Sequence, residues 1–221
     1  KKELKPMIGT TIQDTFKLEL HHLASLTLHQ IGLLFFYFMT ICFVVYFFTA
    51  LYIETYEISM KEGWVMIGLG LSFGILDLVV GDARIFLTVW GLLAYLLVVD
   101  AKYQELPNKV NLMIAILALP VVIQSIVDVG FLKSTLMTGV VVFLIFLGIS
   151  LVGAMGGGDI KMMGAIGLYF PLIEIPQLLI FGFGVGVLHA ITVLFKKDTN
   201  LKTMFAFGPG LIIGVLLTSL L

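Results

Sequence analysis

Long apolar runs separated by short polar stretches make up most of the chain from residue 31 to its end. A run of about 20 such residues crosses the hydrocarbon core of a bilayer as a helix. The pattern therefore predicts an all-α, polytopic membrane protein with about eight transmembrane helices. The expected spans are 31–53, 64–80, 85–99, 109–129, 135–155, 160–171, 177–195 and 205–221.

The sixth run, 160–171, is too short to cross. At about 1.5 Å per residue it covers roughly 18 Å of a core about 30 Å thick. We therefore expect a short or re-entrant helix that begins inside the bilayer profile. Non-helical backbone at that depth is tolerated only against protein or a water-filled cavity. The glycine string that ends at Asp159 is thus a candidate polar pocket.

Composition supports a membrane protein and excludes several other classes. Hydrophobic residues make up 60% of the chain and charged residues 12%, whereas about a quarter of a soluble domain is charged. The net charge of −1 argues against nucleic-acid binding. The single cysteine, Cys42, lies in an apolar run, which excludes disulfides and cysteine-rich zinc sites. The histidines form no metal-ligand pattern, so we expect no metal site.

The distribution of lysine and arginine predicts the orientation. If Asp100 and Asp159 face the cytoplasm, the cytoplasmic loops carry Lys61, Lys102, Lys109, Lys161, Lys196, Lys197 and Lys202, and the short outer loops only Arg84 and Lys133. The lysines of segment 1–30 would then lie outside, against this orientation. That segment mixes apolar and polar residues over 8–28 and is typical of an amphipathic surface helix.

Two aspartates mark the candidate chemistry. Asp100 closes the third run and Asp159 opens the sixth, which puts both at the same membrane face. A charge at membrane depth costs about 2.5–3.5 kcal/mol on insertion scales, so each acid is a functional candidate. Two neighbouring carboxyls share one proton, because like charges close together do not both ionise. Such a pair can take a proton from water and give one to an amide.

Helix ends suggest a division of roles between these two acids. Asp100 ends a helix, whose partial negative charge favours the protonated form. Asp159 precedes a helix and could act as its N-cap, which favours the carboxylate. The sequence therefore predicts Asp159 as the base and Asp100 as the acid.

Three motifs around these acids resemble one family. They are Asp100-x5-Leu106-Pro107-Asn108, Gly156-x-Gly158-Asp159-x-Lys161, and Phe205-Ala206-Phe207-Gly208-Pro209. In this order they resemble the bacterial type IV prepilin peptidases over about residues 64–221. The resemblance implies a multi-pass aspartic endopeptidase of the cytoplasmic (inner) membrane that needs no cofactor or metal. It would remove the short basic leader of prepilins or pseudopilins at the cytoplasmic face, with Asp100 and Asp159 as catalytic residues.

Other motif residues are expected to shape the site or bind substrate: Glu105, Pro107, Asn108, Gly156, Gly158, Lys161, Gly208 and Pro209. Lys161 could hold Asp159 ionised or orient the substrate, or it could only anchor the helix at the interface. Glu54, Glu57, Glu62 and Glu105 could attract a basic leader, or simply solvate their loops.

One departure from the family concerns a second activity. Members that also methylate the new N-terminus carry a larger cytoplasmic region after the first span, often with paired Cys-x-x-Cys motifs. Here that region shrinks to 54–63 and has no cysteine, so N-methyltransferase activity is not expected. The predicted organisation is a surface segment (1–30), a first span with a short loop (31–63) and a peptidase membrane domain (64–221).

Two alternatives stay open. Proteases of the presenilin or signal-peptide-peptidase kind share Gly-x-Gly-Asp, but they have Tyr-Asp and Pro-Ala-Leu where this chain has Val99-Asp100 and Phe207-Gly208-Pro209. An ion-coupled transporter could use the broken sixth span as its binding site, although no inverted repeat is visible. Asp77 is expected to cap a helix or form an ion pair near the outer surface, and His189 to pack within its span.

Overall fold

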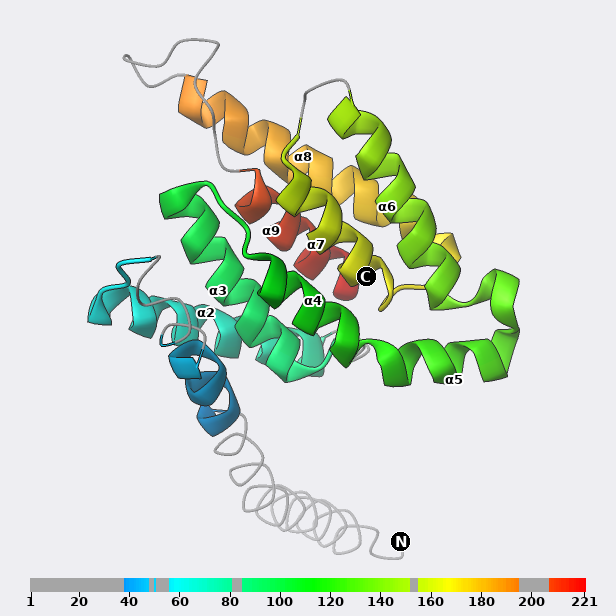
Figure 1. Cartoon of the computed structure of the whole chain (residues 1–221), viewed down its shortest axis with the longest axis horizontal. Coiled ribbons are helices and arrows are strands. Elements are labelled where there is room, and N and C mark those ends of the chain that lie inside the picture. The colour runs from blue at the N-terminus through cyan, green and yellow to red at the C-terminus, as the bar shows by residue number, and fades with distance from the viewer. Residues whose placement is uncertain (1–37, 48–49, 51–55, 81–84, 152–154, 195–206) are drawn as a thin grey trace, which may run out of the picture. The chain divides into compact units, whose positions relative to one another are not determined.

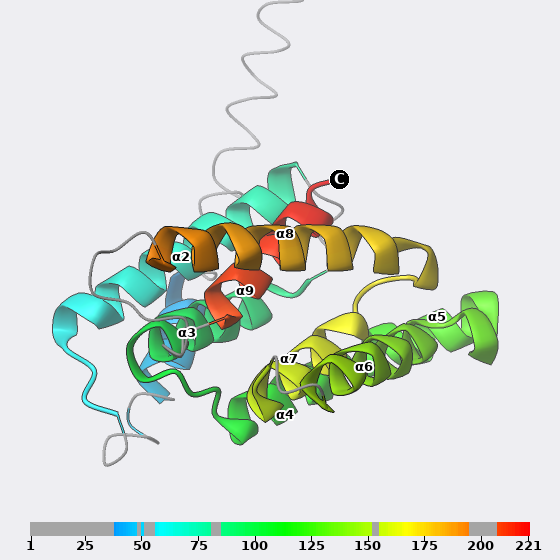
Figure 2. The same cartoon turned by 90° about the horizontal axis from the view of Figure 1, so that it is seen from above.

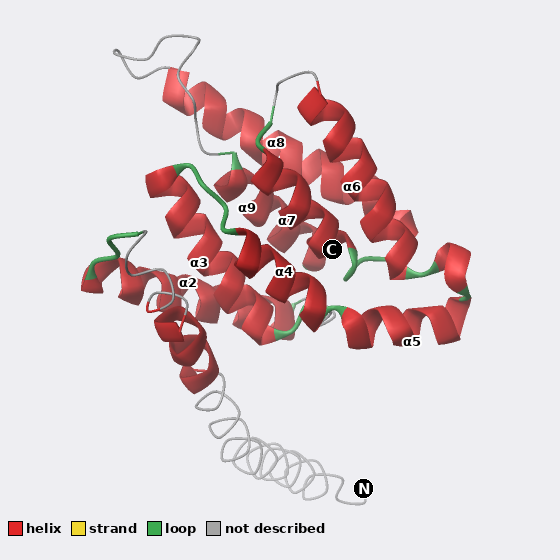
Figure 3. Cartoon of the chain, viewed as in Figure 1, coloured by secondary structure: helices red, strands yellow, loops and turns green. Residues whose placement is uncertain are grey.

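A computed structural model describes residues 38–47, 50, 56–80, 85–151, 155–194 and 207–221. All regular structure in these residues is helical, which confirms the all-α prediction (Figures 1 and 3). The chain divides into two compact units, Lys1–Thr40 and Ile41–Leu221, and the candidate site lies wholly in the second. The expected surface segment 1–30 lies outside the described residues.

The helices follow the apolar runs closely. They are α2 (Met60–Val79), α3 (Leu87–Tyr103), α4 (Asn108–Leu117), α5 (Leu119–Val129), α6 (Thr135–Leu151), α7 (Gly157–Gly167), α8 (Ile175–Leu194) and α9 (Gly208–Ser219), with 3-10 turns η1 (Phe131–Lys133) and η2 (Leu172–Glu174). The most extensive packing joins α8 to α9, α6 to α7 and α2 to α3. Figure 2 shows α4, α6 and α7 side by side, and α8 next to α9.

The expectation of about eight spans is not confirmed. Among the described helices only α2 is long and apolar enough to cross a membrane alone, and α4 with α5 could form a second span bent by 40°. The bend interrupts the expected span 109–129 because Pro120, at the start of α5, lacks the N–H that would continue the helix. The other apolar helices are shorter. Apolar composition predicted where helices form, but not where they break.

Local signals set the helix ends nearest the site. Ser59 and Glu62 form a capping box that starts α2: Ser59 Oγ accepts the Glu62 N–H at 3.3 Å, and the Glu62 carboxylate accepts the Ser59 N–H at 2.6 Å. α3 ends because Gln104 adopts the left-handed conformation, with φ 57° and ψ 34°. The chain therefore turns one residue after α3, and Pro107 leads into α4.

Glycines let the helices behind the site approach closely. A Cβ on Gly214 of α9 would lie 2.4 Å from the Cα of Gly182 in α8, and a Cβ on Gly210 would lie 2.5 Å from the Cα of Gly186. Backbone contact at this range is possible only without side chains. It fixes α9 against α8, and α9 also packs on α3, so that its N-terminus meets the end of α3.

Candidate active site

Asp100 lies in the last turn of α3 and is only 5% exposed. Its Oδ2 accepts the backbone N–H of Gly208, the first residue of α9, at 2.9 Å. A Cβ on Gly208 would lie 2.6 Å from the same oxygen, so a side chain cannot fit there without displacement. The Phe-Gly-Pro motif thus contributes a helix N-terminus that binds the Asp100 carboxyl.

Asp159 lies in the first turn of α7 and is 8% exposed. The sequence predicted Asp159 as the N-cap of this helix. The helix instead begins at Gly157, and its N-cap is Gly156. The Asp159 carboxylate accepts the Gly156 backbone N–H, an interaction typical of an acid at the third helical position. Its Oδ1 is buried without a hydrogen-bond partner among the described residues.

The fold places the two carboxyls within electrostatic range of each other. They are close enough for the charge of Asp100 to act on Asp159. Both lie just outside the expected spans 85–99 and 160–171. Burial raises the pKa of Asp100, and the Gly208 hydrogen bond opposes this rise. Burial, and then the neighbouring Asp100, raise the pKa of Asp159. The pair therefore holds a proton at higher pH than two exposed aspartates would.

The loop after Asp100 packs directly on the glycine motif. A Cβ on Gly158 would lie 2.8 Å from the Leu106 Cβ, which explains why glycine is needed at this position. Asn111 of α4 strengthens the contact, because its Nδ2 donates to the Gly158 carbonyl oxygen at 3.2 Å. Sequence reasoning missed Asn111. Its only signal was a polar residue on an otherwise apolar helix, one turn after Asn108.

The other residues that were predicted to shape the site or bind substrate differ in their contacts and in their exposure. Lys161 Nζ donates to Asn108 Oδ1 at 2.9 Å, so the structure pairs Lys161 with the Leu-Pro-Asn motif. Pro107 is buried at the start of α4, whereas Gly156 is exposed. Pro209 is half-buried in the first turn of α9.

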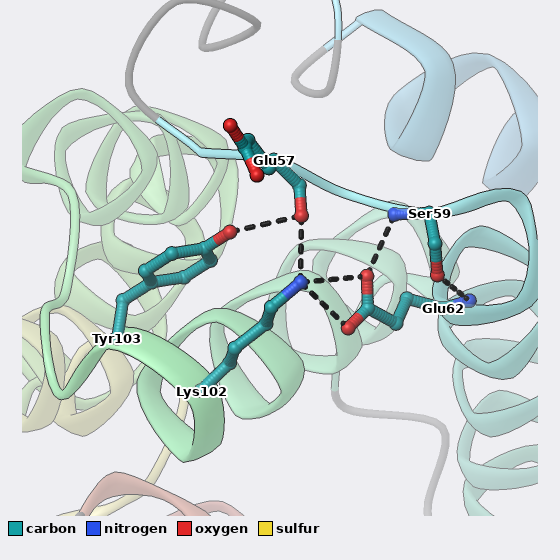
Figure 4. Close-up of polar contacts among 5 residues, drawn as sticks. All are labelled: Glu57, Ser59, Glu62, Lys102 and Tyr103. Atoms are coloured by element: carbon teal, nitrogen blue, oxygen red, sulfur yellow. Dashed lines mark hydrogen bonds and ion pairs between the residues drawn. The ribbon is translucent and has the colours of Figure 1, made fainter.

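A polar cluster fastens the end of α3 to the segment before α2 (Figure 4). Lys102 Nζ lies 2.9 Å from Glu62 Oε1 and donates to the Glu57 carbonyl oxygen at 2.6 Å. Tyr103 donates to the same carbonyl at 2.9 Å. Next to the cluster, Tyr56 donates to Glu105 Oε2 at 3.0 Å. We call Glu57, Ser59, Glu62, Lys102 and Tyr103 the α3 clamp.

The α3 clamp changes the interpretation of the loop acids. Glu62 and Glu105, which were expected to attract a basic leader, are engaged with Lys102 and Tyr56. Glu54 lies outside the described residues. The Glu57 and Glu105 side chains are exposed. A hydrogen bond from the neutral Tyr56 hydroxyl leaves the charge of Glu105 in place, so it is the pairing of Glu62 with Lys102 that reduces the acidic charge offered to a substrate.

Asp77 lies apart from this pair and is not a surface cap. It is 1% exposed within α2, and its Oδ2 accepts the Trp90 Nε1–H at 3.2 Å. The expected role as a helix cap at the outer surface is not what the structure shows, because α3 covers the residue, whereas the alternative of an ion pair stays a prediction. His189 lies in α8, and its side chain is outside the described residues. No cluster of three histidine, cysteine or acidic side chains able to hold a metal occurs in the described part of the chain.

Comparison with known proteins identifies the segment that carries both acids. No curated protein and no solved structure matches the chain. Residues 85–193 match the type IV leader peptidase family. This range runs from the residues before α3 to the end of α8 and includes Asp100, the Leu-Pro-Asn loop and Asp159. The match confirms the resemblance indicated by the motifs: residues 85–193 are similar to the type IV leader peptidase family, which supports a peptidase.

Proposed function

We propose that the chain is an aspartic endopeptidase that removes the basic leader of a prepilin or pseudopilin, using Asp100 and Asp159. The observation that carries this proposal is that two buried carboxyls, one from α3 and one from α7, lie within electrostatic range of each other in a leader peptidase region. Burial and mutual charge favour the singly protonated pair, which is the form that this hydrolysis needs.

In the proposed reaction the ionised carboxylate takes a proton from water while the oxygen of that water attacks the scissile carbonyl carbon. The protonated carboxyl gives its proton to the carbonyl oxygen. Collapse of the tetrahedral intermediate breaks the C–N bond: the carboxyl that accepted the proton returns it to the leaving amine, and the other carboxylate takes a proton from one hydroxyl of the intermediate, which restores the singly protonated pair. One water is consumed, and the products are a new carboxyl end and a new amine.

The roles follow from what each acid contacts. Asp100 accepts an N–H at the positive end of α9, which favours its ionised form. Asp159 has a buried oxygen without a partner in the described chain and feels the charge of Asp100, so the shared proton is assigned to it. Asp100 is then the base and Asp159 the acid, the reverse of the assignment predicted from the two helix ends.

The proposed setting is the cytoplasmic membrane, with the acids at the cytoplasmic face. The lysine-rich loops support this orientation. Large apolar side chains that are more than half exposed, among them Leu112, Leu144 and Ile180, suit contact with lipid. The substrate would carry a basic leader ahead of an apolar helix. Neither a cofactor nor methylation of the product belongs to the proposal.

A cleavage assay with the purified chain in lipid nanodiscs and a prepilin tests this function. We expect Asp100→Asn and Asp159→Asn each to lower the cleavage rate by about 10³-fold or more, within the range general acid–base groups supply. Asp77→Asn is the matched control, because it is equally buried but binds Trp90, and it should keep most of the activity. Full activity in either of the first two variants would refute the two-aspartate mechanism.

A further inference from the structure

The turn that carries Asp159 begins with a run of glycines. They are Gly156, Gly157 and Gly158. Glycine loses more conformational freedom on folding than any other residue, and it is a poor helix former. A Cβ on Gly157 would have nothing within 4 Å, so neighbouring side chains do not enclose this part of the turn. The position of the Asp159 carboxyl therefore depends on contacts that other helices make with the glycine run.

Helix α4 supplies such a contact through Asn111. Its Nδ2 donates to the Gly158 carbonyl oxygen at 3.2 Å, and the side chain is only 2% exposed. The Gly158 carbonyl and the Asp159 N–H belong to one planar peptide unit. The hydrogen bond therefore restrains the peptide plane that leads directly into Asp159.

The same helix is tied to the other acid by a short connection. Only residues 104–107 separate α3, whose last turn carries Asp100, from α4. Leu106 in this connection lies against α7, since a Cβ on Gly158 would lie 2.8 Å from the Leu106 Cβ. A connection this short restricts the relative movement of the helices that it joins. Helix α4 therefore links the end of α3 to the start of α7, and these two helix ends carry the two acids.

The stability of the fold gives no reason for an amide at position 111. Asn111 Oδ1 is buried without a hydrogen-bond partner among the described residues. The Gly158 carbonyl does not depend on the amide either, because a carbonyl within a helix accepts the N–H four residues later. A leucine has nearly the same shape as asparagine and would leave no side-chain polar atom unpaired. The amide thus gives the contact a direction rather than net stability.

We propose that Asn111 is a positioning residue for the reaction: by holding the Gly158 carbonyl, it keeps the Asp159 carboxyl in place beside Asp100. This assignment rests on the proposed function. Asn111 contacts neither the substrate nor the reacting atoms, and it acts only through the first turn of α7. Without its Nδ2–H the glycine run moves more freely, and the two carboxyls spend less time in the productive arrangement.

The variant Asn111→Leu tests this role in the prepilin cleavage assay. We expect kcat to fall by about tenfold and KM to change by less than about twofold, because a misplaced reacting group slows the reaction without weakening binding. The alkaline limb of the pH–rate profile should move to lower pH, since two carboxyls that interact less release their shared proton more readily. Asn111→Ala should act in the same direction, and it covers the case that the larger side chain folds poorly.

The matched control is Tyr169→Phe. The Tyr169 hydroxyl donates to the Ile114 carbonyl oxygen of α4 at 2.9 Å, also in a buried position. That carbonyl, too, accepts an N–H from its own helix segment. The bond fastens α4 just after the end of α7, whereas Asn111 fastens it at the start, next to Asp159. Tyr169→Phe should therefore leave kcat and the pH–rate profile as they are in the wild type.

Hydrogen exchange measures the glycine turn directly, because local opening is separate from global unfolding. Mass spectrometry of a peptide covering residues 157–163, with the protein in nanodiscs, should show exchange about 2- to 10-fold faster in Asn111→Leu, the factor that one hydrogen bond supplies. In Tyr169→Phe the exchange of this peptide should not change.

The results separate this role from the proposed function. Unchanged kcat or unchanged exchange in Asn111→Leu, or an equal loss of kcat in Tyr169→Phe, would overturn the positioning role while wild-type cleavage still supported the proposed function. Absence of wild-type cleavage would instead remove the proposed function and this inference with it.

Discussion

Buried carboxyls lie at both ends of α3, and their surroundings differ. Near the start of the helix, Asp77 of α2 accepts a hydrogen bond from the Trp90 indole. Near its end, Asp100 accepts a backbone N–H from Gly208 and lies close enough to Asp159 to act on its charge. The Asp77 carboxyl is hydrogen-bonded to an aromatic side chain in the core, whereas the Asp100 carboxyl is hydrogen-bonded to a glycine backbone and lies within electrostatic range of a second acid.

This difference teaches how to separate a structural acid from a chemical one. Both are almost fully buried, so burial alone does not distinguish them. What marks Asp100 is a second carboxyl within electrostatic range, because two coupled carboxyls can share and exchange a proton.

Apart from the two acids themselves, the largest effect is expected at Gly208, which binds Asp100 at the end of α3. Gly208→Ala puts a methyl group against the Asp100 carboxylate. We expect the cleavage rate to fall by about 10²-fold, because a displacement near 1 Å at a reacting group costs that much. Gly184→Ala in α8 is the control, since a Cβ there would have nothing within 4 Å. Equal rates in the two variants would show that the Gly208 contact is dispensable.

The pH dependence of cleavage sharpens the comparison. The active pair holds one proton, so the rate rises as the first carboxyl ionises and falls as the second does, by about tenfold per pH unit beyond each pKa. Since burial raises both pKa values, the decline on the alkaline side should begin above the range of an ordinary aspartate. Asp77→Asn should leave the profile unchanged. A rate that keeps rising into alkaline pH would contradict the shared proton.

At the start of α3, a substitution at Trp90 is expected to lower the stability of the protein rather than its catalytic activity. Trp90→Phe removes the indole N–H that Asp77 accepts and leaves a buried carboxyl with one partner fewer. We expect a loss of about 1–3 kcal/mol in the free energy of unfolding, with kcat unchanged in the folded fraction. Denaturant unfolding in detergent, followed by circular dichroism, measures the first quantity. If kcat fell without a loss of stability, the Asp77–Trp90 contact would have a role in the reaction.

The smallest effect is expected at the α3 clamp. Lys102→Met removes an ion pair of exposed side chains, and such pairs contribute about 0–1 kcal/mol. The Asp100 end of α3 should therefore shift little, and kcat should fall by about threefold or less. Glu62→Gln should give a similar result, and the double variant should lose less than the sum of the two single variants, because both changes break the Lys102–Glu62 pair. An additive double variant would mean that the two residues act separately.

The motifs around Asp100 and Asp159 pointed to residues that the structure brings into contact, Gly208 with Asp100 and Lys161 with Asn108. The common membrane face of the two acids stays a prediction, whereas the short sixth run predicted the 11-residue α7. The number of spans could not be predicted, because hydropathy does not show where Pro120 bends a run or where a helix ends early. Asn111 was missed because the partner it binds, the Gly158 carbonyl, is far away in the sequence.

By itself, the sequence determined that the chain is helical, which residues form the family motifs, and that two acids stand at the ends of apolar runs. These properties depend on local composition and on spacing along the chain. The tertiary structure alone decided that α9 directs its first N–H at Asp100, that Asp77 is covered by Trp90, and that Glu62 and Glu105 are engaged rather than free. Each of these facts depends on residues from separate helices meeting in space, and the electrostatics of a buried carboxyl is set by those neighbours.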